Sequence, residues 1–278
     1  MKPYEKIVME HYTEVALSEQ DSETSTMKNL YVRNKETQSI VDVISNVKRN
    51  DEFNQKQMVI MDIGCGNGYT LSELKKIWPQ DIFVGVEKND DLRKLANQRL
   101  NPMGIDVISG DVRFLDELSY PLPDVIISQR VIINLLDKED QNRALEQLKS
   151  KISHKGVIIL IECFNEPLRN LNQARAEFEL EKITPSFHNL YLDEADLYEK
   201  FQDKFRIYQE AGINSNFLSG HYYVSRVLHD VMLQGKPFVR NSHFVNVMSE
   251  VIPDEIGDYS PIKMYVFQKK KDKAEGDL

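Results

Sequence analysis

The sequence is poor in the residues that build disulfide scaffolds, metal clusters and membrane spans. It has 2 cysteines among 278 residues, without a C-x-x-C pair, which excludes a disulfide framework or a cysteine-based zinc site. The N-terminus lacks the apolar segment of a signal peptide, and no stretch stays apolar for the length of a membrane span. We therefore predict a soluble, cytoplasmic protein in which Cys65 and Cys163 are free thiols.

Positive charge is also in short supply. The chain has 35 Lys and Arg against 44 Asp and Glu, a formal net charge of −9, which argues against a protein whose main task is to bind a nucleic-acid backbone. No cluster of His, Asp and Glu at ligand spacing predicts a metal site. Hydrophobic residues make up 41% of the chain, so it can bury a substantial core.

What the chain does have is a glycine-rich turn between Met58 and Thr70, with the sequence M-V-I-M-D-I-G-C-G-N-G-Y-T. The run up to Ile63 predicts a buried parallel strand, and the spacing of apolar residues after Thr70 predicts a helix. Because glycine has no Cβ, backbone N–H groups in such a turn can approach a ligand closely. We predict a nucleotide-like cofactor at the carboxyl edge of a sheet.

Three acidic residues each follow or end a predicted strand. Asp62 lies just before the glycine loop, Glu87 follows the run 82–86, and Asp111 follows 106–109. These positions suit an ammonium group, a ribose diol and an exocyclic amino group, respectively. Tyr69 stands where a dinucleotide loop has its third glycine, and no Gly-Lys-Ser/Thr phosphate loop is present. The set predicts a cationic, phosphate-free adenosine ligand.

These motifs resemble those of the class I S-adenosylmethionine-dependent methyltransferases, over residues 58–164. The loop matches D-x-G-x-G-x-G, an acid ends the second strand, Gly-Asp-Val follows the third, and P-D-V-I-I-S at 123–128 matches the fourth segment. The resemblance implies S-adenosyl-L-methionine as cofactor and S-adenosyl-L-homocysteine as product. Lys88 stands where the family often has an apolar residue against adenine, so we expect its alkyl stem to pack there. The implied cofactor contacts are Asp62, Gly64, Cys65, Gly66, Gly68, Glu87, Lys88, Asp111, Val112 and Gln129.

Alternation of strand and helix patterns predicts an α/β fold, a Rossmann-like seven-stranded, mostly parallel sheet with helices on both faces. We expect an N-terminal helical lid and helical insertions near strands five to seven. The chain is assigned to a single methyltransferase domain, with a cap over 1–50, a cofactor-binding core over 51–164, acceptor-binding insertions with strand six over 165–262, and a last strand with a basic tail over 263–278. Predicted strands cover 58–63, 82–86, 106–109, 125–128, 156–162, 205–208 and 264–268, and predicted helices cover 1–20, 27–48, 70–78, 90–100, 138–150, 167–182, 193–201 and 217–233.

Acceptor contacts are predicted from segments around this core. In related methyltransferases N-terminal helices close over the cofactor, which makes Tyr12 and Arg33 candidates. Arg130 follows the fourth strand, where it would meet the cofactor carboxylate or an acidic acceptor. His188 and His221 are the candidate bases for deprotonating an acceptor. For each of these residues a purely structural role is the alternative. Further acceptor candidates beside the two histidines are Asn189, Tyr191 and Tyr222.

The sequence thus predicts an enzyme that moves a methyl group to an O or N atom of a small molecule, with sugars and secondary metabolites as candidate acceptors. An aminopropyl transferase of the same fold would need acidic residues after strand four, where this chain has Gln129 and Arg130. The absence of an Asn-Pro-Pro-Tyr motif argues against action on DNA bases. Two alternatives stay open, a cofactor-binding protein without turnover and a protein or RNA methyltransferase.

Overall fold

The computed structural model describes residues 2–19, 27–49, 56–210, 213–239 and 241–270. Within them lies one seven-stranded sheet with the strand order β3-β2-β1-β4-β5-β7-β6. The last strand, β7, runs antiparallel to β5 and β6, whereas the pairs from β3 to β5 are parallel. The predicted mostly parallel sheet is therefore confirmed. The strands are β1 (Val59–Ile63), β2 (Ile82–Glu87), β3 (Asp106–Ser109), β4 (Val125–Gln129), β5 (Val157–Cys163), β6 (Phe205–Ile207) and β7 (Ile262–Lys269).

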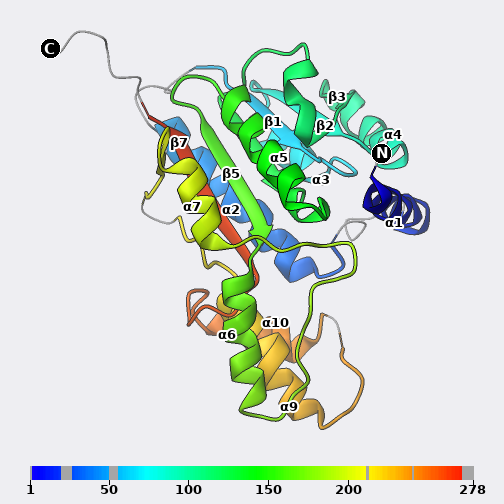
Figure 1. Ribbon diagram of the computed structural model, residues 1–278, viewed down its shortest axis with the longest axis vertical. Helices are drawn as coiled ribbons and strands as arrows, with labels where there is room; N and C mark the ends of the chain where they lie inside the picture. The colour runs from blue at the N-terminus through cyan, green and yellow to red at the C-terminus, as the bar shows by residue number, and fades with distance from the viewer. Residues whose placement is uncertain (1, 20–26, 50–55, 211–212, 240, 271–278) are drawn as a thin grey trace, which may run out of the picture.

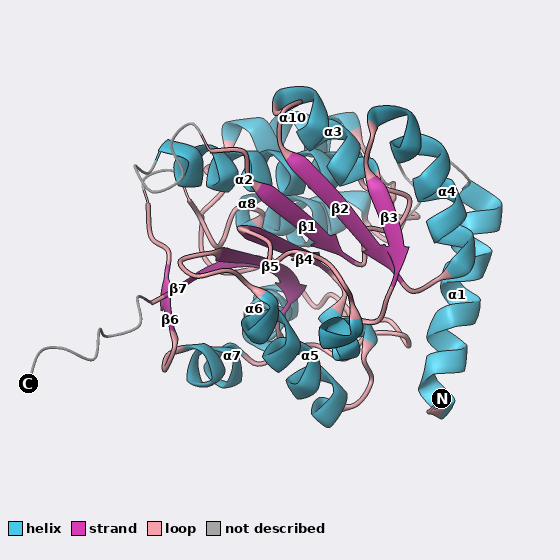
Figure 2. Ribbon diagram, turned by 90° about the horizontal axis from the view of Figure 1, so that it is seen from above, coloured by secondary structure: helices cyan, strands magenta, loops and turns pink. Residues whose placement is uncertain are grey.

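Helices cover both faces of the sheet, as predicted (Figure 2). The first face is covered by α2 (Leu30–Arg49), α3 (Tyr69–Ile77) and α4 (Asp90–Leu100), and the second by α5 (Lys138–Lys151) and α7 (Glu194–Phe201). Helix α1 (Pro3–Glu19) lies along α4, beside the β3 edge of the sheet. Short 3₁₀ turns are η1 (Asn101–Met103), η2 (Val112–Glu117) and η3 (Ile132–Asn134).

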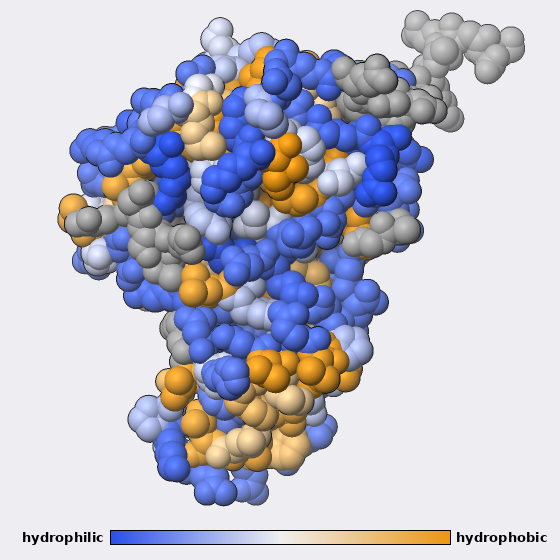
Figure 3. Space-filling model, turned by 180° about the vertical axis from the view of Figure 1, so that it is seen from behind, coloured by the Kyte–Doolittle hydropathy of each residue, from blue (hydrophilic) through white to orange (hydrophobic). Residues whose placement is uncertain are grey.

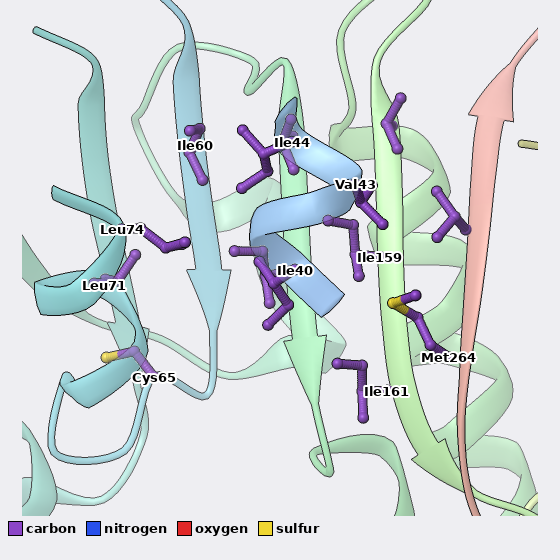
Figure 4. Packing of buried hydrophobic residues seen from close by; sticks show 14 of the residues in the cluster. Ile40, Val43, Ile44, Ile60, Cys65, Leu71, Leu74, Ile159, Ile161 and Met264 are labelled. Carbon is purple, nitrogen blue, oxygen red and sulfur yellow. The ribbon is translucent and has the colours of Figure 1, made fainter. Parts of the chain in front are cut away.

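Helix α2 shows how the sequence pattern produces the first layer. Its buried residues Ile40, Val43, Ile44 and Val47 follow the i, i+3, i+4, i+7 spacing of one helical face. In Figure 4 this face lies over the strands that carry Ile60, Ile159 and Met264. Burying four aliphatic side chains stabilises this contact by about 1.5–3 kcal/mol per side chain, and it fixes the start of α2 above the carboxyl ends of the strands.

A helical lobe extends beyond the carboxyl end of β5 (Figure 1). It contains α6 (Asn165–Ala176), α8 (Ser219–Tyr223), the π-helical turn η4 (Val224–Leu228), α9 (His229–Leu233) and α10 (His243–Val251). Hydrophobic surface gathers on this lobe in Figure 3. The exposed hydrophobic residues of its helices include Met232 and Val251, which are 60% and 72% exposed. The predicted insertions near strands five to seven are thus confirmed, although α10 was not among the predicted helices.

Helix α6 differs from the prediction at both ends. Helix α6 ends at Ala176 rather than near residue 182, and it begins two residues before Pro167. Proline is tolerated there because the N–H groups of a first helical turn have no intrahelical partner. The predicted polar connector 21–26 and the end of the basic tail lie outside the described residues. In the part of the chain that is described, no helix is both long and apolar enough to cross a membrane.

Candidate active site

A deep pocket opens at the carboxyl ends of the central strands, and its volume, mouth included, is about 1120 Å³. The strand order β3-β2-β1-β4 places Asp111, Glu87, Asp62 and Gln129 in a row along its floor. Neighbouring strands are about 4.8 Å apart, so this row spans roughly 14 Å. The pocket therefore suits an elongated ligand that meets an acid at three successive points.

The glycine loop forms the floor between β1 and α3. Gly64 has a φ of 72°, and a Cβ at this position would collide with the Val131 side chain. Gly66 donates its N–H to Glu87 Oε2 at 2.9 Å, which ties the loop to the next strand. Gly68 has a φ of 77° and initiates α3, but it does not line the pocket, because its Cα faces the Leu100 side chain.

Asp62 and Glu87 are buried acids, and Asp62 is the less compensated of the two. Both are below 10% exposed, and Asp62 Oδ1 has no hydrogen-bond partner among the described residues. Burial, with a contribution from the Glu87 charge, raises the pKa of Asp62 to about 8. Burial also raises the pKa of Glu87 to about 7, against the hydrogen bonds it accepts from Asn89 and Gly66. The two acids therefore fit a ligand that carries a cation or hydroxyl donors.

At the β3 side of the pocket the acids are instead saturated by cations. Lys88 Nζ lies 3.0 Å from Glu5 Oε1 and 2.9 Å from Asp111 Oδ2. Arg113 bridges Glu5, Asp111 and Asp140. Burial opposes ionisation of Asp111, but the hydrogen bonds from Arg113 and Lys88 outweigh it and lower its pKa to about 2. Lys88 thus makes ion pairs with its Nζ, in addition to lining the pocket where the sequence predicts packing by its stem.

At the β4 side two guanidinium groups face one carboxylate. Arg33 and Arg130 both line the pocket, and Arg130 Nη1 lies 3.4 Å from Glu36 Oε1. Glu36 Oε2 accepts a hydrogen bond of 2.8 Å from Gln129 Nε2. Burial and the neighbouring Arg130 charge lower the pKa of Arg33 to about 10. This side of the pocket therefore carries an excess of positive charge that suits an anionic group.

Helix α1 covers the pocket with one face, in the place of the predicted N-terminal lid, but Tyr12 is the one residue of α1 predicted as a contact among those that line the pocket. Tyr12, a predicted contact, accepts a hydrogen bond of 2.9 Å from Asn134 Nδ2. The apolar spacing of the first helix contained a signal, because Tyr4, Val8 and Tyr12 lie on its apolar face and line the pocket. The lining residues that were not among the predicted contacts include Tyr4, Glu5, Val8, Met9, Asn67, Thr70, Asn89, Leu92, Asn134 and Leu135.

The two predicted bases lie outside the pocket lining. His188 stacks on His11 with ring centroids 4.0 Å apart and meets the pocket-lining Tyr12 edge-on at 6.3 Å, so it lies beside α1 next to the pocket wall. His221 is buried elsewhere, with Nδ1 2.8 Å from Ser249 Oγ and Nε2 3.1 Å from Asn29 Nδ2. The structure does not bring His221 to the pocket, because helix α8 points its side chain toward α2 and α10.

The predicted acceptor residues of the second half also lie outside the pocket lining. Tyr191 and Tyr222 lie behind the pocket wall near Cys163, and burial raises the pKa of both phenols. Asn189 lies in the loop after His188 and donates its backbone N–H to Ser186 O. Among the predicted candidates, those that the structure brings together are Asp62, Gly64, Cys65, Gly66, Glu87, Lys88, Asp111, Val112, Gln129, Tyr12, Arg33 and Arg130.

The two cysteines are free and buried, as predicted. Burial, with smaller contributions from Glu87 and Asp62, raises the pKa of the Cys65 thiol well above its usual range. The thiol in the glycine loop is therefore protonated at neutral pH and is a packing group rather than a nucleophile. In the described ranges no group of three or more His, Cys, Asp and Glu side chains is placed to hold a metal ion.

The seven-stranded fold and the row of acids Asp111, Glu87 and Asp62 at the strand ends define a Rossmann-like protein of the methyltransferase type. The sequence model of the family described as "Methyltransferase domain" matches residues 54–220, which is more than half of the chain, so the chain belongs to this family. The class of S-adenosylmethionine-dependent methyltransferases predicted from the motifs is thereby confirmed.

Individual relatives are more distant. The chain is 26% identical over 137 residues to the malonyl-[acyl-carrier protein] O-methyltransferase of Bacillus cereus, covering 48% of this chain and 49% of the relative. It is 26% identical over 101 residues to the uncharacterized methyltransferase YdaC of Bacillus subtilis, covering 35% of this chain and 51% of the relative. The chain spans about half the length of these curated relatives.

Two solved structures share the fold over most of the chain. Magnesium protoporphyrin IX methyltransferase from Synechocystis PCC 6803, crystallised with bound SAH, gives a TM-score of 0.56 at 14% identity and covers 96% of this chain and 100% of that one. The plantazolicin methyltransferase BpumL, in complex with a triazolic desmethylPZN analog and SAH, gives a TM-score of 0.53 at 15% identity, covering 98% and 92%. At these identities the likeness concerns the fold.

Proposed function

We propose that the protein transfers the methyl group of S-adenosyl-L-methionine to an O or N atom of a small-molecule acceptor. The observation that carries this proposal is the row of acids at the strand ends, in which Asp62 is buried with an unpartnered Oδ1 among the described residues. A buried carboxylate without a partner is costly, and an ammonium group supplies both the missing charge and the missing hydrogen bonds. The residues present therefore fit the amino group of this cofactor.

The other cofactor contacts follow from the order of the strands. Glu87 accepts from the Gly66 and Asn89 amides and keeps lone pairs for ribose hydroxyls, since each carboxylate oxygen accepts more than one bond. Asp111 and the Val112 amide lie where an adenine edge would be read. Arg33 lies at the opposite side, where it would face the cofactor carboxylate. When bound, S-adenosyl-L-methionine supplies an electrophilic methyl carbon on a sulfonium.

The acceptor would enter between α1 and the turn after β4. Tyr12, Arg130 and Asn134 line this part of the pocket, and they would orient the acceptor's lone pair toward the methyl group. The positive charge of Arg130 favours an acidic acceptor. The similarity to a malonyl-[acyl-carrier protein] O-methyltransferase supports an oxygen atom as the first target to test. His188, beside the pocket-lining Tyr12, stays a predicted base.

The test begins with titration calorimetry of S-adenosyl-L-methionine and S-adenosyl-L-homocysteine, with NAD and ATP as controls. Micromolar binding of the first two alone supports the cofactor, and tight NAD binding contradicts it. Formation of S-adenosyl-L-homocysteine is then followed with a malonyl thioester, a panel of sugars, RNA and protein as acceptors. Cofactor binding without product on any acceptor would favour a binding protein without turnover.

A further inference from the structure

The turn that follows β4 is held by a buried carboxylate that does not line the pocket. Glu162, near the end of β5, is 0% exposed. Its Oε1 accepts the backbone N–H groups of Val131 and Ile132 at 3.0 Å, and its Oε2 accepts that of Ile133 at 3.3 Å. These are orphan donors at the start of η3, so Glu162 does for this turn what a capping residue does for a helix.

The backbone just before this turn adopts a conformation that it would not choose alone. Arg130 has a φ of 56°, in the left-handed region that a non-glycine residue rarely adopts. Its N–H donates to Ile161 O at 2.7 Å, and Asn134 Nδ2 donates to its carbonyl oxygen at 2.8 Å. Such a conformation persists only where its surroundings over-determine it, and Glu162 supplies three of the surrounding bonds.

A second buried carboxylate holds the side chains of the same segment. Glu36 of α2 is 0% exposed and does not line the pocket. It accepts from Gln129 Nε2 at 2.8 Å and lies 3.4 Å from Arg130 Nη1. Thr70 Oγ1 of α3 completes this arrangement, 3.2 Å from Gln129 Oε1. Two carboxylates from different elements therefore fix the backbone and the side chains of one short segment.

We propose that Glu162 and Glu36 are positioning residues that hold Gln129 and Arg130 against the amino-acid end of the bound cofactor. This rests on the proposed function, because the amino-acid end is the part that would lie over Asp62 and β4. Glu87 ends β2 and Asp111 follows β3 as the cap of η2. Both would meet the adenosine part, and in the described part of the chain neither shares a hydrogen bond with a positioning residue. Loss of a positioning residue is therefore expected to affect one part of the ligand and leave the other part unaffected.

The test compares two ligands that share the adenosine part. S-adenosyl-L-homocysteine carries the amino-acid group, and 5′-methylthioadenosine lacks it. In Glu162→Gln, which keeps the shape but places an NH₂ group against backbone donors, we expect about tenfold weaker binding of S-adenosyl-L-homocysteine, as for the loss of ~1.4 kcal/mol. Binding of 5′-methylthioadenosine is expected to stay within about threefold of the wild type. Glu36→Gln is expected to show the same selective loss, and it serves if Glu162→Gln does not fold.

The matched control is Asp124→Asn. Asp124 is 5% exposed and accepts the Val59 N–H at 3.0 Å, at the amino ends of β1 and β4, away from the pocket. We expect Asp124→Asn to lower the melting temperature without changing the ratio of the affinities for the two ligands. Equal loss for both ligands in Glu162→Gln, no loss for either, or a selective loss in Asp124→Asn would overturn the positioning role. Failure of the wild type to bind either ligand would instead contradict the proposed function.

Discussion

The acids on the β3 side of the pocket and the acid at the end of β1 are treated in opposite ways: the first are paired with cations and the second is not. On the β3 side, Asp111 and Glu5 are neutralised by Lys88 and Arg113, and the pKa of Asp111 falls to about 2. At β1, Asp62 has no comparable partner, and burial with the Glu87 charge raises its pKa to about 8. The protein completes one side by itself and leaves the other side to be completed by a ligand. Only the second side pays in stability for its binding function.

The sharpest break in this comparison is Asp62→Asn. We expect cofactor affinity to fall by about 100-fold or more, because a buried carboxylate that meets an ammonium group is replaced by a neutral amide. The apo-protein is expected to become more stable at pH 8, because an uncompensated buried charge is removed. Calorimetry and urea unfolding measure the two effects. A variant that loses stability and keeps affinity would contradict the role of Asp62.

Gly64→Ala perturbs the same side through its backbone. The left-handed φ of 72° costs about 1 kcal/mol for alanine, and the collision with Val131 adds about 1–3 kcal/mol of overpacking. Gly104→Ala is the matched control, since Gly104 has a φ of 69° and no atom near the new methyl group. Urea unfolding is expected to show a larger loss of unfolding free energy at Gly64, and equal losses would mean that the Val131 contact yields without cost.

Proton linkage distinguishes the two sides by sign. The raised pKa of Asp62 means that the folded protein holds this proton more tightly than the unfolded chain does. The contribution of Asp62 to the free energy of unfolding therefore declines as pH rises toward 8, by up to about 1.4 kcal/mol per pH unit. The lowered pKa of Asp111 has the opposite effect, and its contribution is lost as pH falls from about 4 toward 2. Unfolding free energies of wild type, Asp62→Asn and Asp111→Asn between pH 3 and 8.5 test both slopes. Parallel curves for the three proteins would contradict this account.

The smallest expected effect is at the β3 side. Glu5→Gln removes the carboxylate through which α1 meets Lys88 and Arg113, while Asp111 and Asp140 still satisfy Arg113. We expect a loss of about 1.5 kcal/mol in unfolding free energy, the contribution of one hydrogen bond to a charged group, because Lys88 and Arg113 each keep another carboxylate partner. Lys6→Gln, on the exposed face of α1, is the control. A loss as large as that of Gly64→Ala would show that α1 contributes more to the fold than to the pocket.

The sequence predicts the core of this fold well because its signals are local. Helix α4 and strand β3 have the predicted bounds, since Asn89 caps the helix and Asn101-Pro102 closes it. Helix α10 was missed although its 9 residues carry Phe244, Val247, Met248 and Val251 at the i, i+3, i+4, i+7 spacing of an amphipathic helix, so its signal was present in the sequence.

The residues of the pocket also fall into those that the sequence predicts and those that it does not. Asp62, Glu87 and Asp111 are predictable because each follows its own strand. Glu36 and Glu5 reach the site from helices that lie far away in the sequence, and no local motif marks them. Glu162 ends the predicted fifth strand, but no local signal shows that its carboxylate accepts from the turn after β4. The role of His221 depends on which way a short helix faces, and only the packing of α8 against α2 and α10 decides it.

The place of β7 in the sheet has a consequence for how the chain reaches its fold during synthesis. Strand β7 pairs with β5 on one side and β6 on the other, and it is the last strand in the described part of the chain. The four strands that form the pocket can assemble while the ribosome is still adding residues, but until residue 269 is available the edge of β5 stays unpaired and β6 has no neighbour. An open strand edge of this kind invites aggregation, so a nascent chain stalled before β7 is the species that chaperones would need to protect.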